Sequence, residues 1–447
     1  MVPGSAILAA LIVLYSAMAL LLRRWFLSMP LVFVAIGFLL GPGGVGILPL
    51  ALHTNGVKEL TEITLALLLF ADASTLSLRR VSEDAPIPTR LLTIGLPLTM
   101  FLGAALALGL MPTEGLALAA LLGAILAPTD AALGLPIFHN PLVPVRIRRA
   151  LNVESGLNDG IATPFVSLFL AYAVATEDHF PRGWLASALS QIALGLLVAV
   201  VVGVTGGWLL TQTARRGWTS GGSEQIAILG LALAAYLGSL SIHGNGFIAA
   251  FVGGIVFGAV TRDQFAKPTE FTETFGIFLS LLVWVIFGAL LVPSALLHTT
   301  DWRPIVYAVL SLTVVRMLPV ALSLVGTHLR PDTIALMGWF GPRGLASVVF
   351  TLLIVEQAGE GSQAIYTLLT FVVWTILLSV FAHGLSAQPL SSWYARRLSR
   401  AGSKPVELAD LPELRRRHAL LVGPSSAASA TTRVSAIDSA AETTREC

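Results

Sequence analysis

Polar and acidic residues gather in one otherwise apolar stretch, from Asn152 to Thr163. The stretch contains the carboxylates of Glu154 and Asp159 and the amide of Asn158, and an apolar run continues beyond it. In a helix, Ser155 and Asp159 lie one turn apart on the same face. If that helix enters a membrane about nine residues before Asp159, this residue lies roughly 14 Å deep, near the middle of a hydrocarbon core about 30 Å thick. A carboxylate at this depth is costly without a cavity or a partner, so we expect it to be functional.

A second polar motif, Ala127-Pro128-Thr129-Asp130, interrupts the preceding apolar segment. Its proline removes a backbone donor and disrupts the helix, which leaves carbonyl and N–H groups in need of partners. Because the two segments are joined by a short loop and run antiparallel, Asp130 and Asp159 can meet at mid-depth. Carboxylates, freed carbonyls and the hydroxyls of Thr129 and Ser155 suit a hard cation. The same carboxylates can hold a proton in a low-dielectric cavity, so one site could exchange the two ions.

Two arginines, Arg316 and Arg343, fall inside apolar segments, whereas the other basic residues lie in loops or in the C-terminal tail. A buried guanidinium needs an acidic partner, and the partner we expect for Arg316 is Glu154. Arg343 belongs to a second proline motif, Gly341-Pro342-Arg343-Gly344. It could stand in for a cation between two half-helix ends, or it could be a structural donor to freed carbonyls.

The composition is that of an all-α, polytopic membrane protein. The chain is 55% hydrophobic and 12% charged, with a mean hydropathy of +0.82, whereas ordinary soluble domains carry about 25% charged residues. The single cysteine, Cys447, allows no internal disulfide and no thiolate metal cluster. No ATP-binding P-loop pattern occurs, so we expect neither a primary pump nor an enzyme. The expected environment is the lipid bilayer, with no cofactor and no nucleic-acid partner.

Apolar segments bounded by charged or Gly/Pro-rich breaks indicate about thirteen transmembrane helices. The segments are 4–22, 30–50, 59–77, 91–109, 113–138, 150–175, 184–212, 224–241, 245–261, 271–293, 304–326, 332–355 and 363–388. The boundary between the eighth and ninth segments is short, so a reading with twelve spans stays open.

The basic residues predict how the chain is oriented. With the N-terminus outside, the loops on the inner side hold most of the loop Lys and Arg, and the bias alternates from loop to loop. We therefore expect a multi-pass protein of the plasma (inner) membrane with its C-terminus in the cytoplasm. Residues 1–400 form the expected transmembrane domain. Residues 401–447, rich in Ala, Ser and Thr, form an expected disordered cytoplasmic tail.

Thirteen spans divide into six, one connecting span and six more, which would place the second half upside down relative to the first. This is the inverted-repeat plan of secondary transporters, whose site lies between broken helices at the midplane. The two proline motifs fall in the fifth span of each half, so we predict two crossed, unwound helices.

The two acidic motifs, together with Gly341-Pro342-Arg343-Gly344 and Arg316, resemble the monovalent cation:proton antiporters over residues 4–388. The match is to the NhaP-like branch, which is related to the eukaryotic sodium/proton exchangers. This resemblance implies a homodimer with a dimerisation part. It also implies a six-helix core, formed by spans four to six and eleven to thirteen, that contains the two unwound helices.

The resemblance also implies roles for single residues. Asp159 would bind both the transported ion and the proton. Thr129, Asp130 and Ser155 would assist it as ligands of the transported cation. Glu154 and Arg316 would form a structural ion pair.

Asn158 is assigned to the same cation- and proton-binding set. It stands where electrogenic relatives carry a second Asp, and an Asn there goes with electroneutral one-for-one exchange. Asp72 stands about where relatives often have an acid, although the local match is short. Asp72 and Glu273 could each simply lie near an interface or pair with a hydroxyl.

The function we expect is exchange of a monovalent cation for H⁺ by alternating access, in the service of pH and sodium homeostasis. Na⁺ is the expected cation, with Li⁺ or K⁺ as alternatives, so a potassium/proton antiporter of the same fold stays open. A cation channel would also use a midplane acid, and strict coupling of the two fluxes would distinguish an exchanger from it. An intramembrane aspartyl protease would pair two carboxylates, but neither Asp130 nor Asp159 has the Gly-x-Gly-Asp setting expected there.

Overall fold

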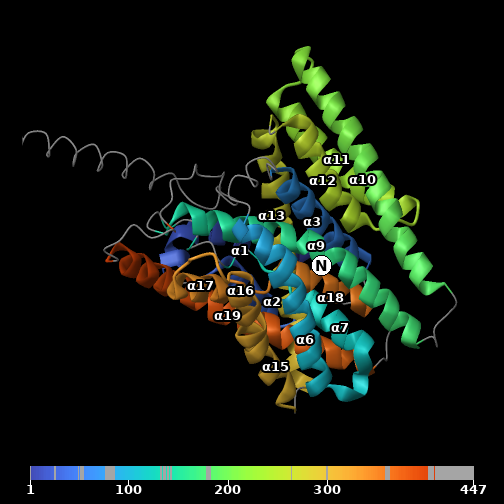
Figure 1. Ribbon diagram of the computed structural model, residues 1–447. Coiled ribbons are helices and arrows are strands. Elements are labelled where there is room, and N and C mark those ends of the chain that lie inside the picture. Colours follow the sequence, from blue (N-terminus) through green and yellow to red (C-terminus); the bar gives the residue numbers. More distant parts are fainter. Residues whose placement is uncertain are drawn as a thin grey trace, which may run out of the picture.

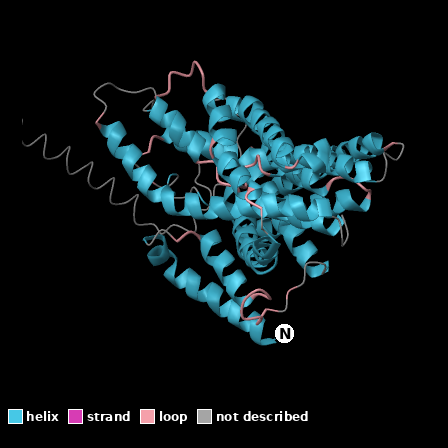
Figure 2. Cartoon of the chain, turned by 90° about the horizontal axis from the view of Figure 1, so that it is seen from below, coloured by secondary structure: helices cyan, strands magenta, loops and turns pink. Residues whose placement is uncertain are grey.

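The computed structural model describes most of the chain as helix. It covers residues 2–24, 27–48, 50, 55–75, 86–130, 133, 137, 140, 143–177, 183–262, 264–298, 301–357, 363–400 and 407. Within these ranges there is no strand (Figure 2), as expected for an all-α membrane protein.

Each expected apolar segment corresponds to a helix or to a run of helices. In the first half these are α1 (Val2–Arg24), α2 (Met29–Leu40), α3 (Asn55–Thr75), α5 (Pro86–Arg90), η1 (Leu91–Gly95), α6 (Leu96–Leu110), η2 (Pro112–Glu114), α7 (Gly115–Ile125) and α9 (Val145–Glu177). There follow α10 (Trp184–Arg215), α11 (Gly221–Ser241), α12 (Gly246–Thr261), α13 (Ala266–Ile286), η4 (Phe287–Leu291), α14 (Val292–His298), α15 (Arg303–Leu312), α16 (Val314–Ser323), α17 (Pro331–Trp339), α18 (Leu345–Gln357) and α19 (Gln363–Ser399). By length and composition, seven helical stretches of the described chain could cross a membrane, and other apolar helices are shorter.

Several helix ends differ from the sequence expectation. Helix α2 ends at Leu40, ten residues before the end expected from hydropathy, because the backbone of Gly41, the residue before Pro42, is extended. Helix α9 begins at Val145 rather than at residue 150, directly after Pro144, a residue suited to a helix start. Helix α19 continues to Ser399, well beyond the apolar segment.

The helices pack in two groups (Figure 1). Helices α10, α11 and α12 lie together at one side with α3 and α13, and α6, α7, α15 and α19 lie at the other. The second group, with α9 and α16 to α18, contains the six spans expected to form the core. Helix α9 packs on α7 in the second group and on α10 and α12 in the first. The acidic stretch therefore lies on a helix that touches both groups.

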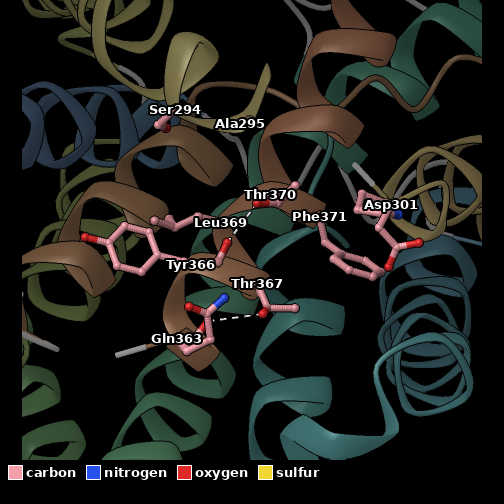
Figure 3. Close-up of a pocket in the computed structure, with 10 residues that line it drawn as sticks. Ser294, Ala295, Asp301, Gln363, Tyr366, Thr367, Leu369, Thr370 and Phe371 are labelled. Atoms are coloured by element: carbon pink, nitrogen blue, oxygen red, sulfur yellow. Dashed lines mark hydrogen bonds between the residues drawn. The ribbon is translucent and has the colours of Figure 1, made fainter. Parts of the chain in front are cut away.

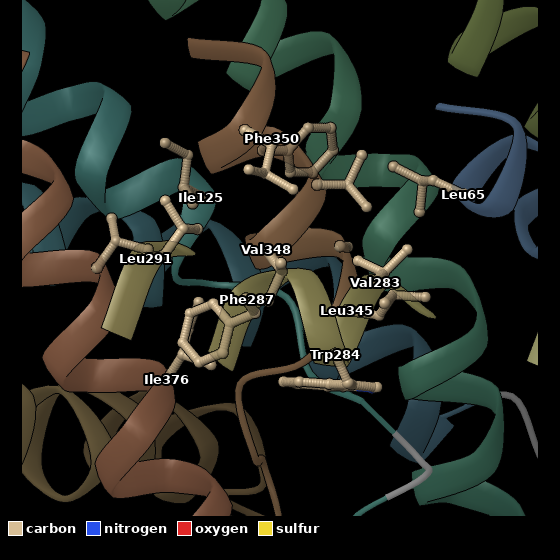
Figure 4. Close-up of a cluster of buried hydrophobic side chains, with 14 of the residues drawn as sticks. Leu65, Ile125, Val283, Trp284, Phe287, Leu291, Leu345, Val348, Phe350 and Ile376 are labelled. Carbon is tan, nitrogen blue, oxygen red and sulfur yellow. The ribbon is translucent and has the colours of Figure 1, made fainter. Parts of the chain in front are cut away.

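A buried apolar cluster joins the groups at the centre (Figure 4). Trp284 of α13 and Phe287 of η4 are almost fully buried and lie among side chains of α7, α18 and α19, such as Ile125, Val348 and Ile376. Lipid tails are as apolar as these side chains, so their gain comes from dense packing rather than from leaving water.

Small residues let α2 and α13 approach closely. A Cβ built on Gly37 would overlap the backbone of Val285, and one built on Gly288 would overlap the backbone of Val34. Backbones that come this close require glycine, which is the usual device for helix packing in membranes.

The tail makes one described contact with the helical body. Glu407 is buried, and its Oε1 accepts hydrogen bonds from Arg330 N and Thr333 Oγ1, both at 2.9 Å. These donors stand at the beginning of α17, where a carboxylate is favoured by the free N–H groups. The rest of the expected disordered segment, 401–406 and 408–447, lies outside the described residues.

The close approach of α2 and α13 gives a first prediction. Gly37→Ala should lower the free energy of unfolding by about 1–3 kcal/mol, because the added methyl group must push the two backbones apart. The control is Gly230→Ala on the exposed side of α11, where an added Cβ meets no atom within 4 Å. Thermal unfolding in detergent measures both. Equal stabilities of the two variants would contradict the backbone contact.

Candidate functional site

Two helix breaks lie against each other in the second group of helices. The first break, residues 126–130, follows α7, which ends at Ile125. The second break, residues 340–344, lies between the end of α17 at Trp339 and the start of α18 at Leu345. Both breaks contain the prolines from which they were predicted, Pro128 and Pro342. The N–H of Asp130 donates to Pro342 O at 2.8 Å, which joins the two breaks directly.

The Asp130 side chain caps the helix that follows the second break. Its Oδ2 accepts a hydrogen bond of 3.1 Å from Leu345 N, the first residue of α18. A carboxylate at this end satisfies a free N–H group and interacts favourably with the helix dipole. A Cβ on Gly344 would overlap the Asp130 side chain, so this cap requires glycine at position 344.

Arg343 satisfies carbonyl groups from two other helix ends. It is fully buried, and its Nη1 donates to Ala127 O at 2.9 Å and its Nη2 to Ser311 O at 3.2 Å. Ser311 lies in the last turn of α15, and Ala127 lies two residues beyond the end of α7. A positive charge near the C-terminal end of a helix is favoured by the helix dipole. Arg343 therefore donates to freed carbonyls and also places a positive charge near two helix ends, which are the two roles considered from the sequence.

Arg316 and Glu154 form a buried ion pair. Arg316 Nη1 lies 2.6 Å from Glu154 Oε1, and the two side chains are 1% and 3% exposed. The pair ties α16 to α9. A Cβ on Gly341 would overlap the Arg316 guanidinium, so the pair also packs directly against the second break.

A small hydroxyl and amide cluster connects the first break to α9. Asn158 Nδ2 donates to Thr129 Oγ1 at 2.6 Å, and Thr129 Oγ1 lies 3.3 Å from Ser155 Oγ. All three side chains are buried. Asn158 Oδ1 is also buried and has no hydrogen-bond partner among the described residues. This arrangement leaves one strong acceptor oxygen beside two hydroxyls.

Asp159 lies next to this cluster at the contact between the two helix groups. It is half-buried on α9, one helical turn beyond Ser155 and therefore on the same face. Its neighbour Gly160 touches α12 so closely that a Cβ there would overlap the Phe251 ring. The acid expected to carry the ion thus stands where the two groups of helices meet.

Two other acids lie on helices that contain neither break. Asp72 is half-buried on α3, where its carbonyl accepts from Thr75 Oγ1 at 3.0 Å. Glu273 is half-buried on α13. Neither residue belongs to α7, α9, α17 or α18, the helices next to the two breaks and the helix of Asp159.

The donor set limits which ions the site could hold. No three His, Cys, Asp or Glu side chains gather in the part of the chain that the structure describes. A bound cation would therefore draw on hydroxyl, amide and carbonyl oxygens as well as on carboxylates, which suits a hard monovalent ion rather than a transition metal.

Three polar residues of the site had not been identified from the sequence. Ser347 Oγ donates to Ile125 O at 2.7 Å and so satisfies the end of α7. Ser379 and His383 lie one turn apart on α19 and contact the second break. The available signal was their spacing of four residues within an apolar helix, which places both on one face.

A separate cavity of about 360 Å³ lies where α15 and α19 begin (Figure 3). Asp301, Gln363 and Tyr366 are among the residues lining it, and none of the predicted site residues does so. The hydroxyls of Thr367 and Thr370 in its wall donate to carbonyls of their own helix. The cavity is therefore distinct from the crossing of the breaks.

Comparison with known proteins agrees with this architecture. Residues 7–393 match the family described as "Sodium/hydrogen exchanger, transmembrane". The chain belongs to this family. The resemblance found in its motifs is thereby confirmed across nearly the whole helical body.

Named relatives are similar at moderate identity. A K(+)/H(+) antiporter NhaP from Alkalimonas amylolytica is 27% identical over 369 residues, which are 81% of this chain and 62% of that protein. A Na(+)/H(+) antiporter from Schizosaccharomyces pombe is 28% identical over 312 residues, 61% of this chain and 64% of that protein. The chain thus spans less than two thirds of the length of these two relatives.

A solved structure shares the fold. The sodium proton antiporter MjNhaP1 from Methanocaldococcus jannaschii matches with a TM-score of 0.68 at 19% identity, over 88% of this chain and 99% of that chain. This match supports the expected antiporter fold with its broken helices.

The ion pair yields a double-mutant prediction. Glu154→Gln and Arg316→Gln should each lower the free energy of unfolding by about 3–5 kcal/mol, because each leaves the opposite charge buried alone. The double variant should lose much less than the sum of the single losses. Chemical or thermal unfolding in detergent measures the cycle.

The matched control is the exposed pair Arg303–Asp301, with 3.8 Å between Nε and Oδ2 and side chains about half exposed. Its cycle should give less than about 1 kcal/mol of coupling. Strictly additive losses at Glu154 and Arg316 would show that the two charges do not stabilise each other.

Proposed function

We propose that this protein is a secondary antiporter that exchanges one monovalent cation for one proton across the plasma membrane by alternating access. The observation that carries the proposal is the setting of Asp159. This half-buried acid lies beside the cluster of Thr129, Ser155 and Asn158, at the contact between two groups of helices.

Two further acids near the breaks have structural contacts. Glu154 is held by Arg316 at 2.6 Å, and Asp130 caps α18 through Leu345 N at 3.1 Å. We assign the exchange of the proton to Asp159, because this half-buried acid lies on α9 beside the hydroxyl and amide cluster, where the two groups of helices meet. Because a carboxylate in a cavity binds either a proton or a cation, loading one ion displaces the other.

Oxygen atoms around Asp159 supply the remaining ligands that a cation needs. The hydroxyls of Thr129 and Ser155 lie within hydrogen-bond distance of each other, and the buried Asn158 Oδ1 accepts no hydrogen bond from the described residues. Hard alkali cations prefer neutral and anionic oxygens of this kind. In our proposal the transported ion contacts Asp159, these hydroxyls and the Asn158 oxygen, with Asp130 close by.

We propose Na⁺ as the transported cation, with K⁺ as the second candidate. The Schizosaccharomyces pombe relative and MjNhaP1 are both named as sodium/proton antiporters, which supports Na⁺. K⁺ agrees with the names of the bacterial NhaP relatives. Cation-dependent proton flux in proteoliposomes, with Na⁺, Li⁺ and K⁺ compared in turn, decides among them.

The exchange we propose is electroneutral. Asn158 is neutral where a second acid would titrate, so one proton is released for each cation bound.

We further propose a homodimer in the plasma membrane, with the N-terminus outside and the C-terminus in the cytoplasm, that serves pH and sodium homeostasis. The alternating distribution of basic residues among the loops supports this orientation.

A cation channel is the competing function. A channel would need a continuous pore, whereas here ion pairs and helix caps join the two breaks to each other and to α9. Strict coupling of proton flux to cation flux distinguishes an exchanger from a channel.

The proposal predicts the behaviour of Asp159→Asn. This variant should fold and insert normally but lose cation-dependent proton flux in proteoliposomes, because the amide can neither release a proton nor neutralise a cation. The matched control is Asp301→Asn, which removes an exposed acid at the start of α15 and should transport at the wild-type rate. Wild-type exchange by the purified Asp159→Asn variant would refute the assignment of Asp159 as ion carrier.

A further inference from the structure

One turn of α19 holds the second break from both sides. Ser379 Oγ accepts a hydrogen bond of 2.7 Å from the backbone N–H of Arg343, which lies within the break. His383 Nε2 lies 2.8 Å from the carbonyl oxygen of Trp339, the last residue of α17. Ser379 and His383 are both fully buried. His383 thus contacts the backbone just before the second break, and Ser379 contacts the backbone near its end.

Both ring nitrogens of His383 face carbonyl oxygens. Nε2 lies 2.8 Å from Trp339 O, and Nδ1 lies 2.9 Å from Ser379 O of its own helix, so a neutral ring, which carries one N–H, can donate to only one of them. We assign the hydrogen to Nε2, because in that tautomer Nδ1 can accept from Ser379 Oγ, 3.2 Å away. The resulting chain runs from Arg343 N–H to Ser379 O–H to His383, and from His383 Nε2–H to Trp339 O.

The end of α17 has two further contacts with the same face of α19. The Trp339 and His383 rings lie 5.0 Å apart between centroids. Trp339 Nε1 donates to Ser386 Oγ at 2.9 Å. The last turn of α17 is therefore fixed to α19, while the first turn of α18 is fixed to Asp130 in the opposite break.

We propose that His383, acting with Ser379, is a positioning residue for the ion site. It fixes the end of α17 and the Arg343 backbone, and Arg343 in turn holds the Ala127 carbonyl beside Thr129 and Asp130. Loss of this connection should let the first break shift, which would misplace the cation ligands without removing any of them. This inference rests on the proposed cation exchange at Asp159.

Two substitutions separate the hydrogen bond from the bulk of the ring. His383→Leu keeps an apolar side chain of similar volume and removes both hydrogen bonds. His383→Gln keeps an N–H donor at about the Nε2 position. We expect His383→Leu to raise the KM for the cation by about tenfold, the effect of losing one hydrogen bond to a buried group, with a much smaller change in kcat. His383→Gln should restore KM to within about threefold of wild type.

Controls on the same helix test the route through Ser379. Ser379→Ala should raise KM in the same direction, and the double variant with His383→Leu should show less than the combined change, because both act on one chain of hydrogen bonds. Thr375→Val, one turn earlier, should leave KM unchanged, since the buried Thr375 hydroxyl donates only to Phe371 O of its own helix.

A second readout does not depend on transport. Hydrogen exchange of the backbone amides in 336–344 should become faster in His383→Leu than in wild type and His383→Gln, while exchange in α12 stays unchanged. Equal KM and equal exchange in the Leu and Gln variants, whether both normal or both impaired, would overturn the positioning role. A wild-type protein that exchanges no cation would refute the proposed function instead, and the hydrogen-exchange comparison would still decide the structural claim.

Discussion

A backbone that leaves the helical path inside a membrane must find partners for its own N–H and carbonyl groups, and the rest of this structure depends on that constraint. The chain meets it by laying two breaks against each other. The N–H of Asp130 donates to Pro342 O, and the Asp130 carboxylate caps α18. Arg343 donates to Ala127 O in the first break and to Ser311 O of α15. Each break therefore supplies hydrogen-bond partners for backbone groups in or next to the other break.

This mutual satisfaction gives several of the charged residues a structural role. Arg343 and Asp130 are occupied in holding the breaks, and Glu154 is occupied by Arg316. Burying an isolated charge costs several kcal/mol, so pairs of this kind are strongly held once they form. Asp159 is half-buried, lies beside hydroxyl and amide oxygens, and stands on α9, a helix that touches both groups. A relative movement of the groups would change access to Asp159 while leaving the fixed pairs intact.

Much of this arrangement could be predicted from the sequence because each inference rested on a strong physical penalty. Proline inside an apolar segment predicts a break, and an unpaired arginine at mid-depth requires an acid, which led to Pro128, Pro342 and the pairing of Arg316 with Glu154. Other features depend on three-dimensional contacts that no local pattern encodes. The carbonyl partners of Arg343 come from helices far apart in the sequence, and His383 looks like any histidine in an apolar helix until Trp339 O is found beside it. Hydropathy also placed the end of α2 too late, because Gly41 turns a chain that is still apolar.

Calorimetry of cation binding tests the central claim most directly. Titration of the purified protein with Na⁺ in buffers of different protonation enthalpy gives the number of protons released for each cation bound. Our account predicts one proton per cation near the pH at which Asp159 is protonated, and no release from Asp159→Asn. Cation binding without proton release in the wild type, or undiminished release in Asp159→Asn, would contradict the claim that one acid binds either ion in turn.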